Sequence, residues 1–380
     1  MRLRLAALPV AMIACAGIST PAQAQKSVFF DGRPSAGPNT IDSQYICVFR
    51  EGAVGRGQAG AEAARAANPA GGQVTHVYEN SIHGFAVHMS AQGLVHMSAR
   101  NPNIAFCEAD QVITLGKPGG GGGGGGTTET IPWGVQRVGG GTTASTHLAW
   151  IIDTGVDLDH PELKVNTALS KNCVSSGRDT GPDDLNGHGT HVAGIIAAKK
   201  NGTGVVGVAP GTTVVSVRVL DRRGSGAYSD VICGVDYVAA HGTAGDVANM
   251  SLGGPVSAAL DAAVLAASAN VKFAIAAGND GADANGSSPA HVNGPNIYTI
   301  SAIDSKDALA SWSNYGNPPV DFAEPGVSIL STWMGGGYNT ISGTSMAAPH
   351  AAGILLLGAI HQNGTATNDK DGTPDPIGHI

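Results

Sequence analysis

The sequence predicts an α/β domain of three layers, with a parallel sheet at its centre, preceded by a small α+β domain of the ferredoxin-like type. After residue 131, short apolar runs alternate with helical segments, whereas residues 45–115 alternate strands and helices in the order βαββαβ. Between the two parts every position from Gly119 to Gly126 is glycine, so no side chain is available there for a core.

In the larger part, the apolar runs lack polar alternation, which is typical of strands buried on both faces of a parallel sheet. The helical segments between them are rich in Ala and Gly, so they can pack closely on that sheet. The expected strands are residues 148–152, 214–219, 247–252, 273–277 and 298–302, and the expected helices are residues 192–198, 231–240, 258–269 and 346–360.

In the smaller part, the expected strands are residues 45–50, 74–78, 85–89 and 104–115, and the expected helices are residues 59–67 and 93–100. In a split βαβ sheet the last strand pairs beside the first. This order places Cys47 and Cys107 on neighbouring strands, within reach of a disulfide.

The first residues have the features of a secretory leader, namely Arg2 and Arg4, an apolar run ending at Ala14 and small residues ending at Ala24. Lipid attachment at Cys15 is an alternative to simple cleavage. We therefore divide the chain into a signal peptide (1–24), a small domain (25–116, core 45–115), a flexible Gly-rich linker (117–130), a main domain (131–362) and a polar C-terminal tail (363–380).

Export also predicts paired cysteines, because thiols outside the cytosol normally become disulfides. Pairing Cys47 with Cys107 and Cys173 with Cys233 gives one bridge in each part, with buried free thiols as the alternative. No pair has the C-x-x-C spacing of a zinc site. A formal charge of -8 argues against a nucleic acid partner, and no later apolar run approaches the ~20 residues of a membrane span.

Three segments each place a reactive residue type at the end of an apolar element, beside glycine. Asp153 follows a predicted strand, His188 opens a predicted helix, and Ser345 begins another. Histidine titrates near neutrality and suits a general base. A hydroxyl at a helix N-terminus lies beside N–H groups that can stabilise an oxyanion. Because sites assemble at strand ends in open α/β sheets, we expect this acid, base and nucleophile to meet there.

Each segment alone permits another interpretation. Asp153 can be a turn residue, and Ser345 or Thr344 can be a simple N-cap. His188 and His191 are three positions apart on one predicted helix. The zinc motif H-E-x-x-H needs i,i+4 spacing and a glutamate, so metal ligation by this pair is disfavoured.

Taken together, residues 132–357 resemble the subtilisin superfamily of serine proteases, closest to its proteinase K-like branch, with an interruption near Cys173. Residues 45–115 resemble the inhibitory I9-type propeptide of that family. Besides the three segments, the resemblance rests on Pro132–Val135, Gly207–Pro210, Arg218–Asp221, Ser251–Gly254, Ala276–Asn279 and Asp321–Gly326, and in the propeptide on Tyr45–Arg50, His83–Ala86 and Glu108–Val112.

The resemblance implies a secreted serine endopeptidase of broad specificity, made as a self-processing zymogen. Ser345 would be the nucleophile, His188 the general base, Asp153 the group that orients the imidazole, and Asn279 the side-chain donor to the oxyanion. Residues 25–116 would act as an intramolecular inhibitor and chaperone, with cleavage between about residues 116 and 128.

The same resemblance implies a cleft in which the substrate adds a β-strand, lined by Gly224, Ser225, Gly226, Tyr228, Ser251, Leu252, Gly253, Ala276, Ala277 and Gly278. It also implies a structural calcium held by the carbonyls of Pro295 and Ile297 and the carboxylate of Asp321, and a cis bond at Ser288–Pro289. We expect a monomer that acts on proteins or peptides without a catalytic cofactor. The competing functions are an inactive binding protein with the same fold, and hydrolysis of esters or acyl transfer by the same nucleophile.

Overall fold

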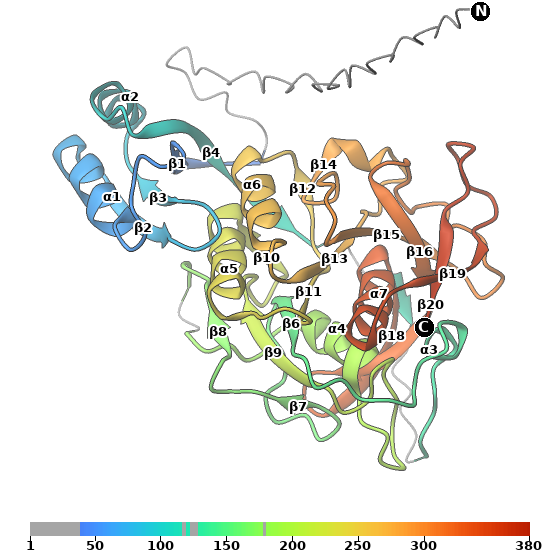
Figure 1. Cartoon of the computed structure of the whole chain (residues 1–380). Helices are drawn as coiled ribbons and strands as arrows, with labels where there is room; N and C mark the ends of the chain where they lie inside the picture. The colour runs from blue at the N-terminus through green and yellow to red at the C-terminus, as the bar shows by residue number, and fades with distance from the viewer. Residues whose placement is uncertain (1–38, 116–118, 122–127, 178–179) are drawn as a thin grey trace, which may run out of the picture.

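The computed structural model describes residues 39–115, 119–121, 128–177 and 180–380. The predicted leader, with Cys15, lies outside these residues. Figure 1 shows a small N-terminal domain packed against a larger main domain, with helices on both sides of the main sheet. No helix in the described part of the chain is both long and apolar enough to cross a bilayer.

The small domain has the predicted order of elements. Its strands are β1 (Thr40–Phe49), β2 (Gln73–Tyr78), β3 (Gly84–His88) and β4 (Ile104–Thr114), and its helices are α1 (Ala59–Ala67), the 3₁₀ turn η1 (Asn68–Ala70) and α2 (Ala91–Arg100). The strands lie in the order β4-β1-β3-β2, so the last strand pairs with the first. Cys47 and Cys107 are directly opposite each other on β1 and β4 and form a disulfide.

The main domain is built on one sheet with the strand order β19-β20-β16-β15-β13-β11-β6-β9-β7, and β8 also pairs with β9. Every pair in this sheet is parallel except β19 with β20. The strands are β6 (Ala149–Asp153), β7 (Lys164–Val165), β8 (Lys171–Asn172), β9 (Thr213–Arg218), β11 (Val247–Met250), β13 (Lys272–Ala276), β15 (Ile297–Ile303), β16 (Val320–Pro325), β19 (His361–Thr365) and β20 (Pro376–His379).

Helices pack on both faces of this sheet. They are α3 (Trp133–Arg137), α4 (His188–Ala197), α5 (Tyr228–His241), α6 (Ala258–Ala267) and α7 (Thr344–Leu357), and shorter elements are β10 (Ser225–Ala227), β12 (Gly254–Pro255), η2 (Ala284–Gly286), β14 (Ser287–Ser288), β17 (Ile329–Trp333) and β18 (Gly337–Ser342). Cys173 is joined to Cys233 of α5 by the second disulfide.

Alternate side chains of each central strand face two separate cores. Trp150 and Ile152 of β6 belong to the core that contains α5 and α6, whereas Ala149 and Ile151 belong to the core that contains α4 and α7. Successive residues of a strand point to opposite faces, so the uninterrupted apolar runs are explained by burial on both sides. The predicted three-layer α/β architecture is confirmed.

The small domain lies over α5 and α6 (Figure 1). Its strand β4 continues into the main domain, where it pairs antiparallel with β10. Ile113 of β4 and Tyr78 of β2 are buried in the core that contains α5 and α6. The contact therefore combines apolar packing with a shared strand pair.

The expected flexible linker is wrong for part of its length. Gly119–Gly121 form strand β5, which pairs antiparallel with β18. Glycine still carries a backbone donor and acceptor, and an open strand edge can satisfy both without any side chain. A pattern of side chains could not predict this strand. The glycines from 122 to 126 lie outside the described residues.

The expected polar tail is also corrected. Strands β19 and β20 form a hairpin, and β20 pairs with β16 at the edge of the main sheet. Asp375 and Ile377 are fully buried. The predicted boundary at residue 362 therefore falls inside the main domain. The sequence did not reveal β20, because a four-residue strand with one large apolar side chain shows no periodicity.

Candidate active site

Asp153, His188 and Ser345 come from three different elements that meet near the centre of the sheet. Asp153 is the last residue of β6, His188 the first of α4, and Ser345 the second of α7. Gly187 before His188 has a left-handed φ of 107°, and glycine adopts this conformation without strain. The fold thus assembles all three predicted residues at the carboxyl end of β6.

The acid and the base form a buried pair. The Nδ1 atom of His188 lies 2.8 Å from Oδ1 of Asp153, and this oxygen also accepts the N–H of Thr154 at 2.7 Å. Burial alone would lower the pKa of His188, but the charge and hydrogen bond of Asp153, together with the charge of Asp184, raise it above its usual value. The arrangement stabilises an imidazolium, as a general base requires.

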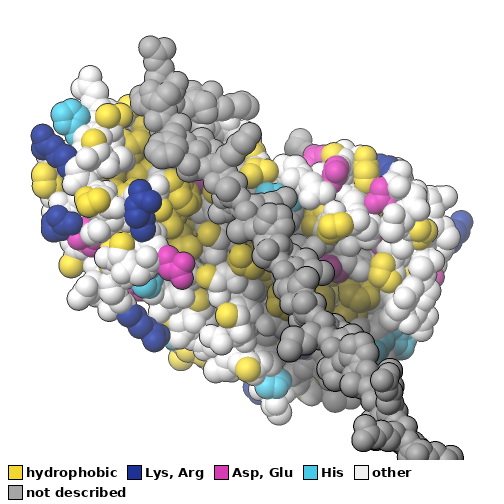
Figure 2. All heavy atoms as spheres, turned by 45° about the horizontal axis from the view of Figure 1, so that its top comes forward, with side chains coloured by type: hydrophobic (Ala, Val, Ile, Leu, Met, Phe, Trp, Pro, Cys, Tyr) yellow, Lys and Arg dark blue, Asp and Glu magenta, His cyan; other side chains and the backbone are white. Residues whose placement is uncertain are grey.

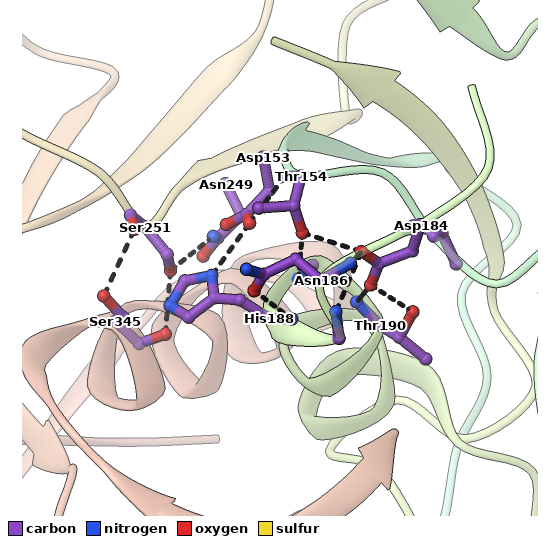
Figure 3. A network of polar contacts seen from close by, with 12 residues as sticks. Asp153, Thr154, Asp184, Asn186, His188, Thr190, Asn249, Ser251 and Ser345 are labelled. Carbon is purple, nitrogen blue, oxygen red and sulfur yellow. Dashed lines mark hydrogen bonds and ion pairs between the residues drawn. The ribbon is translucent and has the colours of Figure 1, made fainter. Parts of the chain in front are cut away.

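Ser345 lies on the other side of the imidazole. Figure 3 shows the His188 ring between Asp153 and Ser345. The Ser345 hydroxyl donates to the carbonyl oxygen of Ser251 at 3.1 Å rather than to the imidazole. The Ser251 hydroxyl in turn donates to the Ser345 carbonyl oxygen at 2.8 Å. Hydrogen bonds of catalytic groups are often long or poorly aligned when no substrate is bound.

Asn279 presents its amide nitrogen beside the nucleophile. Its Oδ1 accepts both the backbone N–H of Thr344, at 2.9 Å, and the Thr344 hydroxyl, at 3.0 Å. The Nδ2 group is thereby directed away from Thr344. A Cβ placed on Gly343 would lie 3.6 Å from the Ser345 nitrogen and 3.7 Å from Asn279 Nδ2. Two N–H donors therefore border one small space that a side chain would fill, as expected for an oxyanion site.

A cavity of about 390 Å³ opens next to Asn279. Of the residues predicted for the cleft, the cavity wall contains Gly253, Ala276, Ala277 and Gly278, and it adds Gly254, Pro255, Asp280, Gly286, Ser287 and Ala290. Ser251 and Leu252 connect β11 to this wall. Tyr228 is fully buried, and its hydroxyl donates to the carbonyl oxygen of Pro255 at 2.6 Å.

Residues 224–226, predicted to form one wall of the substrate cleft, pair with another part of the same chain. Ser225 and Gly226 pair with Thr114 and Ile113 of β4, and Leu115 donates its N–H to the carbonyl oxygen of Gly224 at 2.9 Å. Four residues further on, Gly119 begins the pairing with Ser342 on β18. One segment thus pairs with β10 at one end and with β18 at the other, and residues 116–118 between the pairs lie outside the described residues.

Sequence reasoning missed two residues that organise the site. The buried carboxylate of Asp184 accepts the Thr154 hydroxyl at 2.9 Å and both the N–H, at 3.0 Å, and the hydroxyl, at 2.6 Å, of Thr190 (Figure 3). It therefore ties the end of β6 to the start of α4. Asn314 holds the loop around Asn279. Both lie in loops between helices and strands, where Asp and Asn are common, so neither gave a distinguishing signal.

Of the residues expected to hold calcium, Asp321 has a partly buried carboxylate near the start of β16. Asp321 accepts the N–H of Thr299 at 2.9 Å, and burial raises the pKa of Asp321 to about 6 against this hydrogen bond. Because burial disfavours the ionised form of Asp321, a bound cation would stabilise that form. No group of three or more His, Cys, Asp or Glu among the described residues could hold a metal, so such a site would need backbone carbonyls. Ser288–Pro289 is cis.

Comparison with known proteins defines the class of this protein. The chain belongs to the Subtilase family, whose profile matches residues 150–369, more than half of the sequence. It is therefore a subtilisin-like serine protease, as the sequence predicted.

Several relatives are similar over most of the chain. The chain is 35% identical over 345 residues to Proteinase R of Parengyodontium album, covering 86% of this chain and 82% of that protein. It is 40% identical over 302 residues to Alkaline serine exoprotease A of Vibrio alginolyticus. That alignment covers 75% of this chain but only 53% of the relative. A cold adapted subtilisin-like serine proteinase of known structure is similar with a TM-score of 0.58 and 38% identity, covering 64% of this chain and 96% of that one.

Proposed function

We propose that this chain is a secreted endopeptidase of broad specificity, made as a zymogen that processes itself. The observation that carries the proposal is the buried hydrogen bond between Asp153 and His188 beside Ser345 at the start of α7. The name of one relative, Extracellular serine proteinase of a Thermus strain, supports secretion.

In the proposed mechanism, Ser345 Oγ attacks the peptide carbonyl while Nε2 of His188 takes its proton. Asp153 keeps the proton of the imidazole on Nδ1 and stabilises the imidazolium. The oxyanion is held by Nδ2 of Asn279 and the N–H of Ser345. His188 then protonates the leaving amine, which gives an acyl-enzyme at Ser345, and a water activated by His188 hydrolyses it.

We propose that the small domain is the inhibitory propeptide and a folding chaperone. Its strand β4 fills the cleft in an antiparallel pair with β10, which is the pairing that an extended substrate would use. Ile113, buried next to Gly254 and Tyr228, would occupy an apolar outer pocket. The pairing of Leu115 with Gly224 and of Gly119 with Ser342 favours cleavage within residues 116–118.

Carboxylates of the small domain support this role, because they lie at helix N-termini of the main domain. Glu108 accepts the Ser257 hydroxyl at 2.5 Å and the N–H of Ala258 at 3.1 Å, at the start of α6. Asp110 accepts the N–H of Ser229 at 3.2 Å, at the start of α5. Both acids satisfy backbone donors that otherwise lack partners.

Proteins and peptides are the proposed substrates, and main-chain pairing in the cleft favours broad specificity. We further propose a monomer that needs no catalytic cofactor and holds one structural calcium at Pro295, Ile297 and Asp321. An ester hydrolase or acyl transferase would use the same nucleophile, but no described contact favours it over the protease.

The proposal is tested with the full-length precursor and its Ser345→Ala variant. The wild type should shorten to a mature chain whose first residue lies between 117 and 119, and it should react with a serine-directed fluorophosphonate and hydrolyse casein. Ser345→Ala should remain full length and do neither. Wild-type protein that reacts with the label but cleaves only short-chain esters would instead support the esterase. A precursor shortened equally in both variants would exclude self-processing.

A further inference from the structure

The loop that carries Asn279 is folded around a single buried side chain, that of Asn314, which is 1% exposed. Asn314 lies between β15 and β16, far from the loop in sequence. Four hydrogen bonds join them: Asn314 Nδ2 to Ala277 O at 2.9 Å, Asn314 N to Gly278 O at 2.9 Å, Asp280 N to Asn314 Oδ1 at 2.9 Å and Ala282 N to Asn314 Oδ1 at 3.1 Å. The bonds reach both sides of Asn279.

The backbone of the loop is shaped to this side chain. Gly278 has a left-handed φ of 109°, and a Cβ at that position would collide with Nδ2 of Asn314. The loop can approach Asn314 this closely only because residue 278 is glycine. The Asn314 side chain thus binds the loop only through backbone groups: its Nδ2 donates to one carbonyl oxygen, and its Oδ1 accepts two N–H groups.

Asn279 itself has little packing to fix it, because its side chain is exposed. Its Oδ1 is held by Thr344, next to the nucleophile, and its backbone is held through the neighbours that bind Asn314. An oxyanion donor must be held within about 0.5 Å of its productive position before the reaction begins. We propose that Asn314 is a positioning residue that fixes the backbone of Asn279 so that its Nδ2 meets the oxyanion. This inference rests on the proposed role of Asn279.

The test is a double-mutant cycle on the mature enzyme with a peptide substrate. Asn279→Ala should lower kcat by ~10²–10³-fold. Asn314→Ala should lower kcat by about 10²-fold, the effect of misplacing a catalytic group by about 1 Å, with KM little changed. If Asn314 acts through Asn279, adding Asn314→Ala to Asn279→Ala should reduce kcat less than about twofold further, because the two substitutions remove one interaction.

Asn317→Ala is the matched control, since Asn317 lies three residues away and its side chain binds outside the Asn279 loop. Its Nδ2 donates to Val320 O, at the start of β16, at 2.9 Å, and its side chain also hydrogen-bonds Asp375. This substitution should leave kcat within about twofold. Asn314→Asp, which keeps Oδ1 but loses the donor to Ala277, repeats the cycle if Asn314→Ala does not fold, and it should show the same dependence on Asn279.

Unchanged kcat in folded Asn314 variants, or an equal loss with and without Asn279, would overturn the inference. Unchanged kcat in Asn279→Ala would instead show that the proposed oxyanion donor is wrong. The two failures are therefore distinct, and active-site titration of each variant separates a slower enzyme from a smaller folded fraction.

Discussion

Two groups of carboxylates accept backbone N–H groups in this protein, one inside the main domain and one between the domains. Asp153 and Asp184 have all their partners in the main domain. Glu108 and Asp110 of the small domain, and Asp236 on α5, accept groups from the opposite domain. The chemistry of the contacts is the same, but only the second group loses its partners when the domains separate.

Hydrogen bonds of the same kind therefore serve two purposes, one within the main domain and one between the two domains. Figure 2 shows charged side chains scattered over the visible face rather than gathered on one patch. The interfacial acids accept hydrogen bonds from particular donors of the opposite domain. An acid held within one domain keeps a fixed geometry, as catalysis requires. An acid shared between domains exchanges its partners for water on release, which makes the contact strong but separable.

The largest effect should come from the internal acid that holds the imidazole. Asp153→Asn should keep the shape of the site but favour the wrong tautomer of His188, and kcat should fall by about 10⁴-fold. Steady-state hydrolysis of a peptide substrate measures this, with the melting temperature as a check of folding. A loss of less than about tenfold in folded protein would show that the Asp153–His188 bond is not used in catalysis.

An intermediate effect should come from Asp236, where five donors meet one carboxylate. They are Glu79 N at 3.2 Å, Asn80 N at 2.8 Å, Asn80 Nδ2 at 3.1 Å, Ser81 N at 2.7 Å and Ser81 Oγ at 2.9 Å. Asp236→Ala should weaken the small domain's hold by about 1.5–3 kcal/mol, or roughly tenfold to a hundredfold in its dissociation constant.

This weaker hold should appear as a shorter delay between precursor cleavage and full activity, measured by a continuous peptide assay. Asp159→Ala removes an exposed carboxylate and is the matched control. The kcat of the fully mature Asp236→Ala enzyme should equal that of the wild type. An unchanged delay would show that the interfacial acids do not retain the small domain.

The smallest effect should come from Asp321. Its pKa is raised from 3.8 to about 6, so its charge in the folded protein changes around pH 6. Calcium needs the ionised carboxylate, so added calcium should raise the melting temperature more at pH 8 than at pH 5, by about 2–4 °C per kcal/mol of binding. Without calcium, the folded pKa lies above the unfolded value, so stability should instead fall as pH rises through this range. Scanning calorimetry with calcium or a chelator tests both, and Asp321→Asn should abolish the calcium-dependent increase.

The sequence was sufficient for those parts of the fold that depend on side-chain patterns. The strands around Ile151 and Ala274 are apolar at every position because both faces are covered, and this pattern is visible without coordinates. Asp153, His188 and Ser345 could be predicted because each follows or begins such an element. The pairing of Cys47 with Cys107 followed from the strand order of the small domain.

The remaining parts depend on contacts that no local pattern encodes. Strand β5 consists of glycine, and β20 is too short to show a period. Asn314 and Asp236 act on backbone groups 32 to 157 positions away, and backbone groups are the same for every residue type. Such partners become visible only when the chain is folded.

Strand β20 also has a practical consequence. It covers the outer edge of β16 through the pairing of Ala323 with Ile377, and Asp375 just before it receives the hydroxyl of Ser301 at 2.5 Å. Trimming an expressed chain to the last residue of the family match, Asp369, would remove this cover. The bared edge of β16 would then be a template for strand-to-strand association between molecules, so recombinant versions that stop there invite aggregation.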